Sequence, residues 1–329
     1  MNRVASAFLE NRMPQADAPT RRTFLASLAA AGAAAVLRPW NAAAYPGPTA
    51  ARPGPILTRP IPSSGENLPL VGLGSWITFN VGEDPVARDS CSEVLRAFFI
   101  EGGRLIDSSP MYGSSQEVIG YGLHKLQAPS QLFSADKVWT SSDERGPEQV
   151  EESRRRWGVA RFDLLQVHNL MSWEEHLPKL FAMKAAGRLR YVGVTTSDGR
   201  RHAEIERIMR SRPLDFVQVS YNVLDREVEE RILPLARERR IAVIVNRPLR
   251  RGELIRRVER FPLPAWAGEI DCANWAQVLL KFIVSHPAVL CAIPATSRVD
   301  HVRENLGASY GRLPDEAMRR RIVAHVEKL

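Results

Sequence analysis

Residues 163–194 read DLLQVHNLMSWEEHLPKLFAMKAAGRLRYVGV and contain one complete strand–helix–strand unit. The apolar runs DLLQV (163–167) and YVGV (191–194) have the length and composition of buried strands. Between them, residues 173–186 follow a helical pattern that ends before Gly187, although Pro178 is unusual inside a helix. Two buried strands joined by a helix are expected to lie parallel in a sheet that is covered on both faces.

The same alternation continues on both sides of this unit. Further strand-like runs lie at residues 70–73, 104–107, 131–139, 216–219, 242–245 and 289–293. Further helical patterns lie at residues 88–101, 116–125, 149–157, 201–210, 227–238 and 275–285. Eight strand–helix units within about 260 residues favour a closed (β/α)8 (TIM) barrel over an open sheet. The sequence therefore predicts one α/β barrel domain at residues 68–329.

A doubly wound nucleotide-binding fold is the main alternative to the barrel. Such a fold approaches a pyrophosphate with the glycines of a G-x-G-x-x-G sequence after a strand. No strand-like run in this chain is followed by that sequence, and the GLG at 72–74 lacks both the third glycine and a following helix. The pattern therefore favours the barrel.

Composition excludes several classes of protein. Of the 329 residues, 44% are hydrophobic and 25% are charged, which is typical of a globular chain rather than a disordered or fibrous one. The 3 cysteines form no CxxC pair, which argues against a disulfide scaffold, a zinc finger and a cysteine-bound iron–sulfur cluster. The net charge is +8, but the arginine clusters lie in separate helical segments interleaved with acidic residues. We therefore expect exposed helix faces and no nucleic-acid partner.

The first 44 residues resemble a twin-arginine (Tat) signal peptide. Arg21 and Arg22 precede a weakly apolar stretch at 26–37, and small residues at 42–44 offer a cleavage site. The apolar stretch is shorter than the ~20 residues that a membrane-spanning helix needs. We expect export of the folded protein to the periplasm through the Tat machinery, with no stable membrane span; an amphipathic or disordered arm is the alternative.

Residues 45–67 are expected to form a proline-rich tether between this segment and the barrel. Six prolines fall between residues 45 and 62, and the stretch has no strand or helix periodicity. The sequence thus predicts three parts, which are the signal peptide at 1–44, the tether at 45–67 and the barrel at 68–329.

Four polar residues fall at or just after the ends of predicted strands. Asp107 ends the second strand, Tyr112 follows five residues later, Lys137 lies in the third strand region and His168 follows the fourth strand. In a (β/α)8 barrel, active-site residues lie at this carboxyl end of the strands. A single Asp there is commonly a helix cap, and a single His is commonly structural. All four at one face indicate a catalytic site.

The chain from about residue 68 onward resembles the aldo-keto reductase superfamily. The matching stretches are GLGSW (72–76), GGRLIDSSPMYGSSQEVIGYGL (102–123), DKVW (136–139), DLLQVH (163–168), RLRYVGVTTSD (188–198), VQVSYN (217–222) and IPATSRVDHVRENL (293–306). The resemblance implies an oxidoreductase that reduces aldehydes or ketones, or oxidises alcohols or sugars in reverse. By resemblance, the catalytic tetrad is Asp107, Tyr112, Lys137 and His168.

These four residue types suit carbonyl reduction. Adding hydride to a carbonyl develops negative charge on oxygen, which a positioned proton donor neutralises. The tyrosine hydroxyl has a pKa of about 10 in water, and a neighbouring lysine ammonium is expected to lower that pKa. An aspartate would hold the lysine charged, and the histidine would orient the carbonyl oxygen. This chemistry needs no metal.

The resemblance also implies a nicotinamide cofactor, with NADPH preferred over NADH. The residues mapped to cofactor binding are Gly74, Ser75, Asp107, Thr195, Thr196, Gln218, Asn246, Arg247, Pro248, Leu249, Thr296, Ser297, Arg298, Arg303, Glu304 and Asn305. Arg298 and Arg303, with Thr296 and Ser297, would meet a 2′-phosphate at a helix N-terminus. Two departures stand out, because relatives usually have Ser-Asn at 195–196 and often have an aromatic residue at 246.

The substrate pocket is defined less closely. Trp76, Tyr112, Trp139, His168 and Asn169 are expected to line its mouth. The chain ends soon after a predicted helix at 315–329, which implies an open pocket for several small aldehydes or sugars.

Two other functions remain open from the sequence. One is a cofactor-binding regulatory or interaction protein with little turnover, since a fold does not imply catalysis. The other is a different barrel enzyme, such as an isomerase or a glycosidase. A glycosidase needs two facing carboxylates, and Asp107 is the one clear candidate at a strand end.

Overall fold

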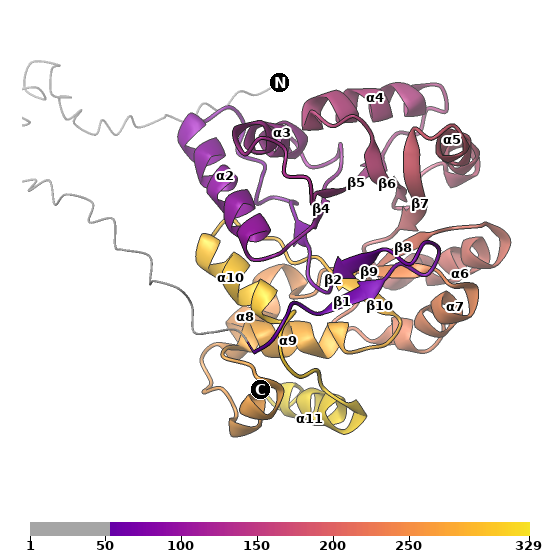
Figure 1. Cartoon of the computed structure of the whole chain (residues 1–329). Helices are drawn as coiled ribbons and strands as arrows, with labels where there is room; N and C mark the ends of the chain where they lie inside the picture. The colour runs from indigo at the N-terminus through magenta and orange to yellow at the C-terminus, as the bar shows by residue number, and fades with distance from the viewer. Residues whose placement is uncertain (1–52) are drawn as a thin grey trace, which may run out of the picture. The chain divides into compact units, whose positions relative to one another are not determined.

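Within residues 53–329, which a computed structural model describes, the strands of the main sheet form a parallel barrel (Figure 1). They are β3 (Leu73–Gly74), β4 (Leu105–Asp107), β5 (Phe133–Val138), β6 (Phe162–His168), β7 (Leu189–Thr195), β8 (Phe216–Ser220), β9 (Ala242–Asn246) and β10 (Val289–Ala292). Each strand pairs in parallel with the next one along the chain. The predicted signal peptide at 1–44 and the tether up to residue 52 lie outside the described residues.

The last strand returns to the first and closes the barrel. Parallel bridges join Val71 to Ala292 and Gly74 to Ala295. At Gly74, an added Cβ would lie 2.8 Å from the carbonyl oxygen of Ile293, so this close approach requires glycine. The predicted (β/α)8 barrel is therefore confirmed.

Helices follow the strands and cover the outside of the barrel (Figure 1). They are α2 (Pro85–Ile100), α3 (Ser115–Lys125), α4 (Arg145–Trp157), α5 (Trp173–Ala185), α6 (His202–Ser211), α7 (Ile232–Arg239), α8 (Glu253–Val258), α9 (Trp275–Val284), α10 (Val299–Gly307) and α11 (Glu316–Val326). Short 3-10 turns lie at η1 (Gly199–Arg201), η2 (Glu227–Glu229), η3 (Arg250–Gly252) and η4 (Ala265–Ile270). The helix predicted at 227–238 is divided into η2 and α7. Pro234 explains the break, because it has no N–H to donate and is tolerated only in the first turn of a helix.

Inward-pointing side chains divide the barrel into an apolar layer and a polar layer. Phe133, Tyr191 and Phe216 pack against one another in the apolar layer, with ring centroids 5.4–6.1 Å apart. The same faces of β5 and β8 then carry Lys137 and Gln218 toward the carboxyl end. Since side chains alternate along a strand, one register places apolar residues deep in the barrel and polar residues at its carboxyl end.

A β-hairpin closes the amino end of the barrel and corrects the predicted tether. Strands β1 (Thr58–Pro60) and β2 (Asn67–Pro69) pair antiparallel, and Ile61 and Leu68 are fully buried in the interior apolar layer. The segment from residue 58 is therefore part of the fold, because its two apolar side chains fill the end of the barrel. Proline content alone did not reveal this role.

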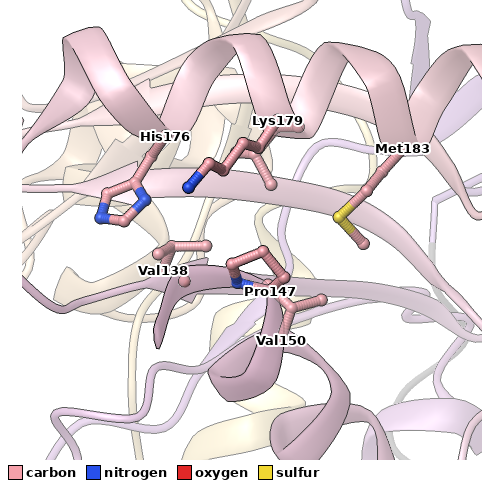
Figure 2. A pocket seen from close by; sticks show the side chains of 8 residues that line it. Val138, Pro147, Val150, His176, Lys179 and Met183 are labelled. Atoms are coloured by element: carbon pink, nitrogen blue, oxygen red, sulfur yellow. The ribbon is translucent and has the colours of Figure 1, made fainter. Parts of the chain in front are cut away.

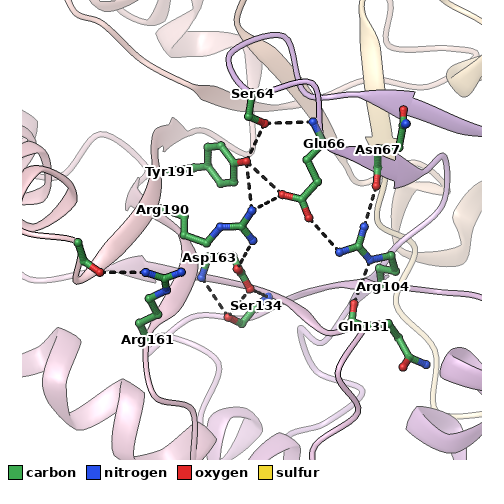
Figure 3. Close-up of polar contacts among 11 residues, drawn as sticks. Ser64, Glu66, Asn67, Arg104, Gln131, Ser134, Arg161, Asp163, Arg190 and Tyr191 are labelled. Carbon is green, nitrogen blue, oxygen red and sulfur yellow. Dashed lines mark hydrogen bonds and ion pairs between the residues drawn. The ribbon is translucent and has the colours of Figure 1, made fainter.

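An ion-pair network holds the hairpin loop against the barrel (Figure 3). Glu66 pairs with Arg104 at 2.9 Å and also with Arg190, and Arg190 pairs with Asp163 at 2.7 Å. Although burial acts to raise it, the pKa of Glu66 lies below its usual value because both arginines donate hydrogen bonds to the carboxylate. This end of the barrel is thus occupied by structural contacts. None of the helices in residues 53–329 combines the length and the apolar character needed to cross a membrane.

Candidate active site

A cavity of about 430 Å³ opens at the carboxyl end of the sheet. Its walls come from the carboxyl ends of the strands and from the loops that follow β3, β4, β6, β7, β9 and β10. They include Gly74, Ser75, Trp76, Ile77, Thr78, Asp107, Met111, Tyr112, His168, Asn169, Thr195, Ser197, Gln218, Asn246, Arg247, Pro248, Leu249, Arg251, Gly252, Ile293, Pro294, Ala295, Thr296, His301, Glu304 and Asn305. Most of the predicted site residues therefore share one cavity, at the end of the barrel where this fold places active sites.

Lys137 and Asp107 form a buried ion pair beneath the cavity floor. Lys137 Nζ lies 2.5 Å from Asp107 Oδ2 and 2.7 Å from the carbonyl oxygen of Ser108. The side chains of Lys137 and Asp107 are 0% and 3% exposed. Burial is the largest single influence and acts to lower the pKa of Lys137, but the charge and hydrogen bond of Asp107, together with the nearby Tyr112 and Asp136, raise the pKa above its ordinary value. The lysine therefore carries a positive charge inside the barrel.

Tyr112 lies above this pair and faces His168. Lys137 Nζ is 5.0 Å from the centroid of the Tyr112 ring, and the rings of Tyr112 and His168 are 5.6 Å apart in an edge-to-face arrangement. Burial raises the pKa of Tyr112 above its ordinary value, and the nearby Lys137 opposes that rise. The lysine thus acts in the predicted direction. The sequence led us to expect a pKa of Tyr112 below that of the free side chain. That expectation was wrong, because desolvation of the phenolate has a larger effect on the pKa than Lys137 has.

His168 is held as a neutral imidazole. It is 4% exposed, and its Nδ1 lies 2.8 Å from Ser109 Oγ. Burial and the positive charge of Lys137 lower the pKa of His168 to about 2. The ring is therefore uncharged throughout the pH range in which proteins function, which suits an orienting role better than proton delivery.

A chain of amide and hydroxyl hydrogen bonds extends from Asp107 across the floor. Gln218 Nε2 donates to Asp107 Oδ1 at 2.9 Å, and Thr195 Oγ1 donates to Gln218 Oε1 at 3.1 Å. Asn246 Nδ2 donates to the carbonyl oxygen of Thr196 at 2.9 Å. These bonds orient the residues expected to meet a nicotinamide ring, and they give Asn246 a role in the floor where relatives often have an aromatic residue.

Some predicted residues lie outside the cavity wall. Lys137 lies below it, Thr196 is buried outside it, and Ser297, Arg298 and Arg303 are not part of the wall. Arg298 instead pairs with Asp300, and its side chain is 62% exposed. Arg303 pairs with Glu101 at 3.6 Å.

Trp139 does not line the cavity either, and its expected place at the mouth is corrected. Its backbone is bound on both sides by the Gln149 side chain, with Trp139 N–H donating to Oε1 at 2.7 Å and its carbonyl oxygen accepting from Nε2 at 2.9 Å. These bonds tie the backbone after β5 to α4.

The structure adds residues that the sequence did not single out. Arg251 lies over the Trp76 ring, with its guanidinium carbon 4.2 Å from the ring centroid, and connects the loops after β3 and β9. Asp136, next to Lys137, is fully buried and accepts hydrogen bonds from Gln116 and Trp157. Burial raises the pKa of Asp136 to about 7. The one available signal for Asp136 was a charged residue within a buried strand.

A second cavity of about 10 Å³ lies between α4 and α5 (Figure 2). Val138, Pro147, Val150, His176, Lys179 and Met183 line it. His176 Nε2 contacts the carbonyl oxygen of Thr140 at 2.8 Å, so the ring has a structural partner. This cavity is too small for a substrate. Over the described range, no group of three or more His, Cys, Asp or Glu side chains is arranged to hold a metal ion.

The fold and the cavity define a barrel enzyme whose polar site lies at the carboxyl end of a parallel sheet. Comparison with known proteins agrees, since residues 70–326 match the model of the aldo/keto reductase family. Methylglyoxal reductase YeaE of Escherichia coli is 30% identical over 246 residues, which cover 73% of this chain and 84% of that protein. The chain therefore belongs to the aldo/keto reductase family of oxidoreductases.

Two further relatives show how far the similarity extends. The NADH-specific methylglyoxal reductase of Escherichia coli is 27% identical over 236 residues, covering 61% of this chain and 69% of that protein. A crystal structure of an aldo-keto reductase from Klebsiella pneumoniae in complex with NADPH matches with a TM-score of 0.67 and 24% identity. That match covers 84% of this chain and 95% of the other, and it supports the fold.

Proposed function

We propose that the protein reduces small aldehydes or ketones with NADPH, and that Tyr112 is its proton donor. The observation that carries this proposal is the convergence of four side chains from three different strand ends. Asp107 and Tyr112, Lys137, and His168 come from three separate stretches of the sequence and meet at or directly beneath one cavity. A protein that only bound a cofactor would have no need of a proton donor coupled to a buried ammonium.

The donor set of the cavity fits a nicotinamide dinucleotide. Arg247 and Arg251 bring positive charge to the wall after β9, which suits a pyrophosphate. Glu304 and Asn305 offer carboxylate and amide groups on α10, which suit an adenine. Thr195 and Gln218 lie near the tetrad, where they would hold a carboxamide. When bound, the cofactor supplies the hydride for carbonyl reduction.

The side chains of this chain then perform the proton chemistry. His168, neutral and fixed, orients the carbonyl oxygen beside the Tyr112 hydroxyl. Tyr112 gives its proton to that oxygen as negative charge develops there. Lys137 stabilises the resulting phenolate, and Asp107 keeps the lysine charged and in place. Burial keeps the tyrosine protonated until transfer, because it disfavours the phenolate when no substrate needs the proton.

The test is oxidation of NADPH and of NADH by the purified protein with a panel of small aldehydes, including methylglyoxal. We expect faster turnover at a subsaturating concentration of NADPH than at the same concentration of NADH.

Arg298→Ala is expected to weaken NADPH binding roughly tenfold with little effect on NADH binding, since a charged hydrogen bond to a 2′-phosphate is lost. Arg320→Ala, which removes an exposed arginine on α11, is the control.

If Arg298→Ala weakens the binding of NADPH and NADH equally, Arg298 does not contact the 2′-phosphate, and Arg303 becomes the next candidate. Arg298 must also leave Asp300 to reach a phosphate, which limits the size of the effect. No turnover of any carbonyl with either cofactor would contradict the proposed reductase and favour the cofactor-binding alternative.

We also propose that the protein is exported in folded form, on the strength of the arginine pair and apolar stretch in its first 44 residues. Changing both Arg21 and Arg22 to Lys is expected to leave active precursor in the cytoplasm, while the parent is recovered from the periplasm beginning near residue 45. Fractionation followed by N-terminal sequencing measures both. Equal periplasmic recovery of the two proteins would contradict the signal.

A further inference from the structure

We propose that Ser109 is a positioning residue that fixes the imidazole tautomer of His168 and so makes Nε2 the hydrogen-bond donor toward the carbonyl oxygen. This inference deepens the proposed reductase function and rests on it. It concerns a serine between Asp107 and Tyr112 to which neither the sequence motif nor the family match assigns a role.

Ser109 touches both groups that face the substrate. Its carbonyl oxygen accepts the backbone N–H of Tyr112 at 3.0 Å, which sets the turn that carries the tyrosine. Its Oγ lies 2.8 Å from His168 Nδ1. Ser109 is 0% exposed and His168 is 4% exposed, so water does not compete for this contact.

The direction of the Ser109–His168 hydrogen bond follows from the acceptors that the Ser109 hydroxyl can reach. Ser109 Oγ also accepts the backbone N–H of Met111 at 3.2 Å. A hydroxyl group has one hydrogen to donate, and among the hydrogen bonds of the described residues His168 Nδ1 is the one acceptor available to it. The Ser109 hydroxyl therefore donates to Nδ1. A neutral imidazole that accepts at Nδ1 carries its hydrogen on Nε2.

The imidazole is neutral, so the tautomer decides its chemistry. If Nδ1 carried the hydrogen, Nε2 would present a lone pair to the carbonyl oxygen and repel it. With the hydrogen on Nε2, the ring donates to that oxygen beside Tyr112. Ser109 acts through His168 and does not itself reach the reacting atoms, because its hydroxyl group is hydrogen-bonded to His168 Nδ1 and to the Met111 N–H.

The experiment compares the parent protein with Ser109→Ala. In the cofactor-free parent, ¹⁵N NMR of histidine-labelled protein is expected to show one His168 ring nitrogen protonated and the other unprotonated, in the Nε2–H pattern. The His168→Gln variant assigns the signals by removing them. In Ser109→Ala, we expect a mixture of tautomers and a kcat lower by about threefold to tenfold, with the Kd for NADPH unchanged.

Ser115→Ala is the matched control. Ser115 is a buried serine six residues away whose hydroxyl bonds to Ser108 Oγ at 3.0 Å, and its loss should leave the His168 signals and kcat at parental values. An Nδ1–H pattern in the parent, or an unchanged tautomer in Ser109→Ala, would overturn the proposal even if kcat fell. Absence of carbonyl turnover in the parent would contradict the reductase function, whereas the NMR measurement would still decide the hydrogen bond.

Discussion

Tyr112→Phe is expected to lower the rate of carbonyl reduction by ~10²–10⁴-fold, because it removes the proton donor and leaves the ring in place. The phenyl ring can keep the edge-to-face contact with His168, whose centroid lies 5.6 Å away. NADPH affinity should therefore remain close to that of the parent. Steady-state turnover and a fluorescence titration with NADPH measure the two quantities on the same preparation.

Tyr121→Phe provides the control for this substitution. Tyr121 lies on α3, its hydroxyl donates to Asp89 at 2.7 Å, and it is not part of the cavity wall. Its loss should not affect reduction. If Tyr112→Phe retains turnover within a factor of two of the parent, another group delivers the proton and the assignment is wrong.

Lys137→Met is expected to be similarly damaging, and for two separable reasons. Without the ammonium, the phenolate of Tyr112 loses its stabilising charge, so the pKa of Tyr112 rises further above its ordinary value. Reduction requires the protonated tyrosine, so the basic limb of the pH–rate profile should move to higher pH while the rate at neutral pH falls. The substitution also leaves the Asp107 carboxylate buried without its partner, which costs about 3–5 kcal/mol of stability.

Lys281→Met separates the catalytic effect from the cost of losing a buried lysine. Lys281 is also 0% exposed, and its Nζ is held by the carbonyl oxygens of Ile270 and Arg312 at 2.6 and 3.0 Å, away from the cavity. Thermal unfolding should show a loss of stability for both Lys137→Met and Lys281→Met. A shift of the basic limb should occur in Lys137→Met alone, and an unchanged limb there would show that Lys137 does not set the pKa of Tyr112.

The sequence predicted the architecture well because each strand and helix leaves a local pattern. Every predicted strand of the barrel overlaps an observed one, from β3 to β10. Two stretches differ from the prediction. Pro234 divides one predicted helix, and α8 and η4 occupy a stretch between β9 and α9 for which no helix was predicted.

The convergence of the four candidate catalytic residues could also be anticipated, since strand ends of a barrel meet at one rim and the motif around Asp107 and Tyr112 is specific. Of the residues predicted to bind the cofactor, only part lie in the cavity wall. Thr296, Glu304 and Asn305 reach the cavity, whereas Arg298 lies outside its wall and pairs with Asp300. All of them belong to one short segment, so a motif locates the segment but does not decide which side chain turns inward.

The sequence by itself determined the barrel, the placing of polar residues at the carboxyl ends of its strands, and the four candidate catalytic residues. Tertiary structure decided the rest. It placed Ser109 against His168, left Trp139 outside the cavity wall and raised the pKa of Tyr112 by burial. The physical reason is the distance along the chain over which each feature is decided. Periodicity and spacing in the sequence depend on residues within one strand or helix. Hydrogen-bond partners and desolvation depend on loops from distant strands, which meet only when the barrel closes.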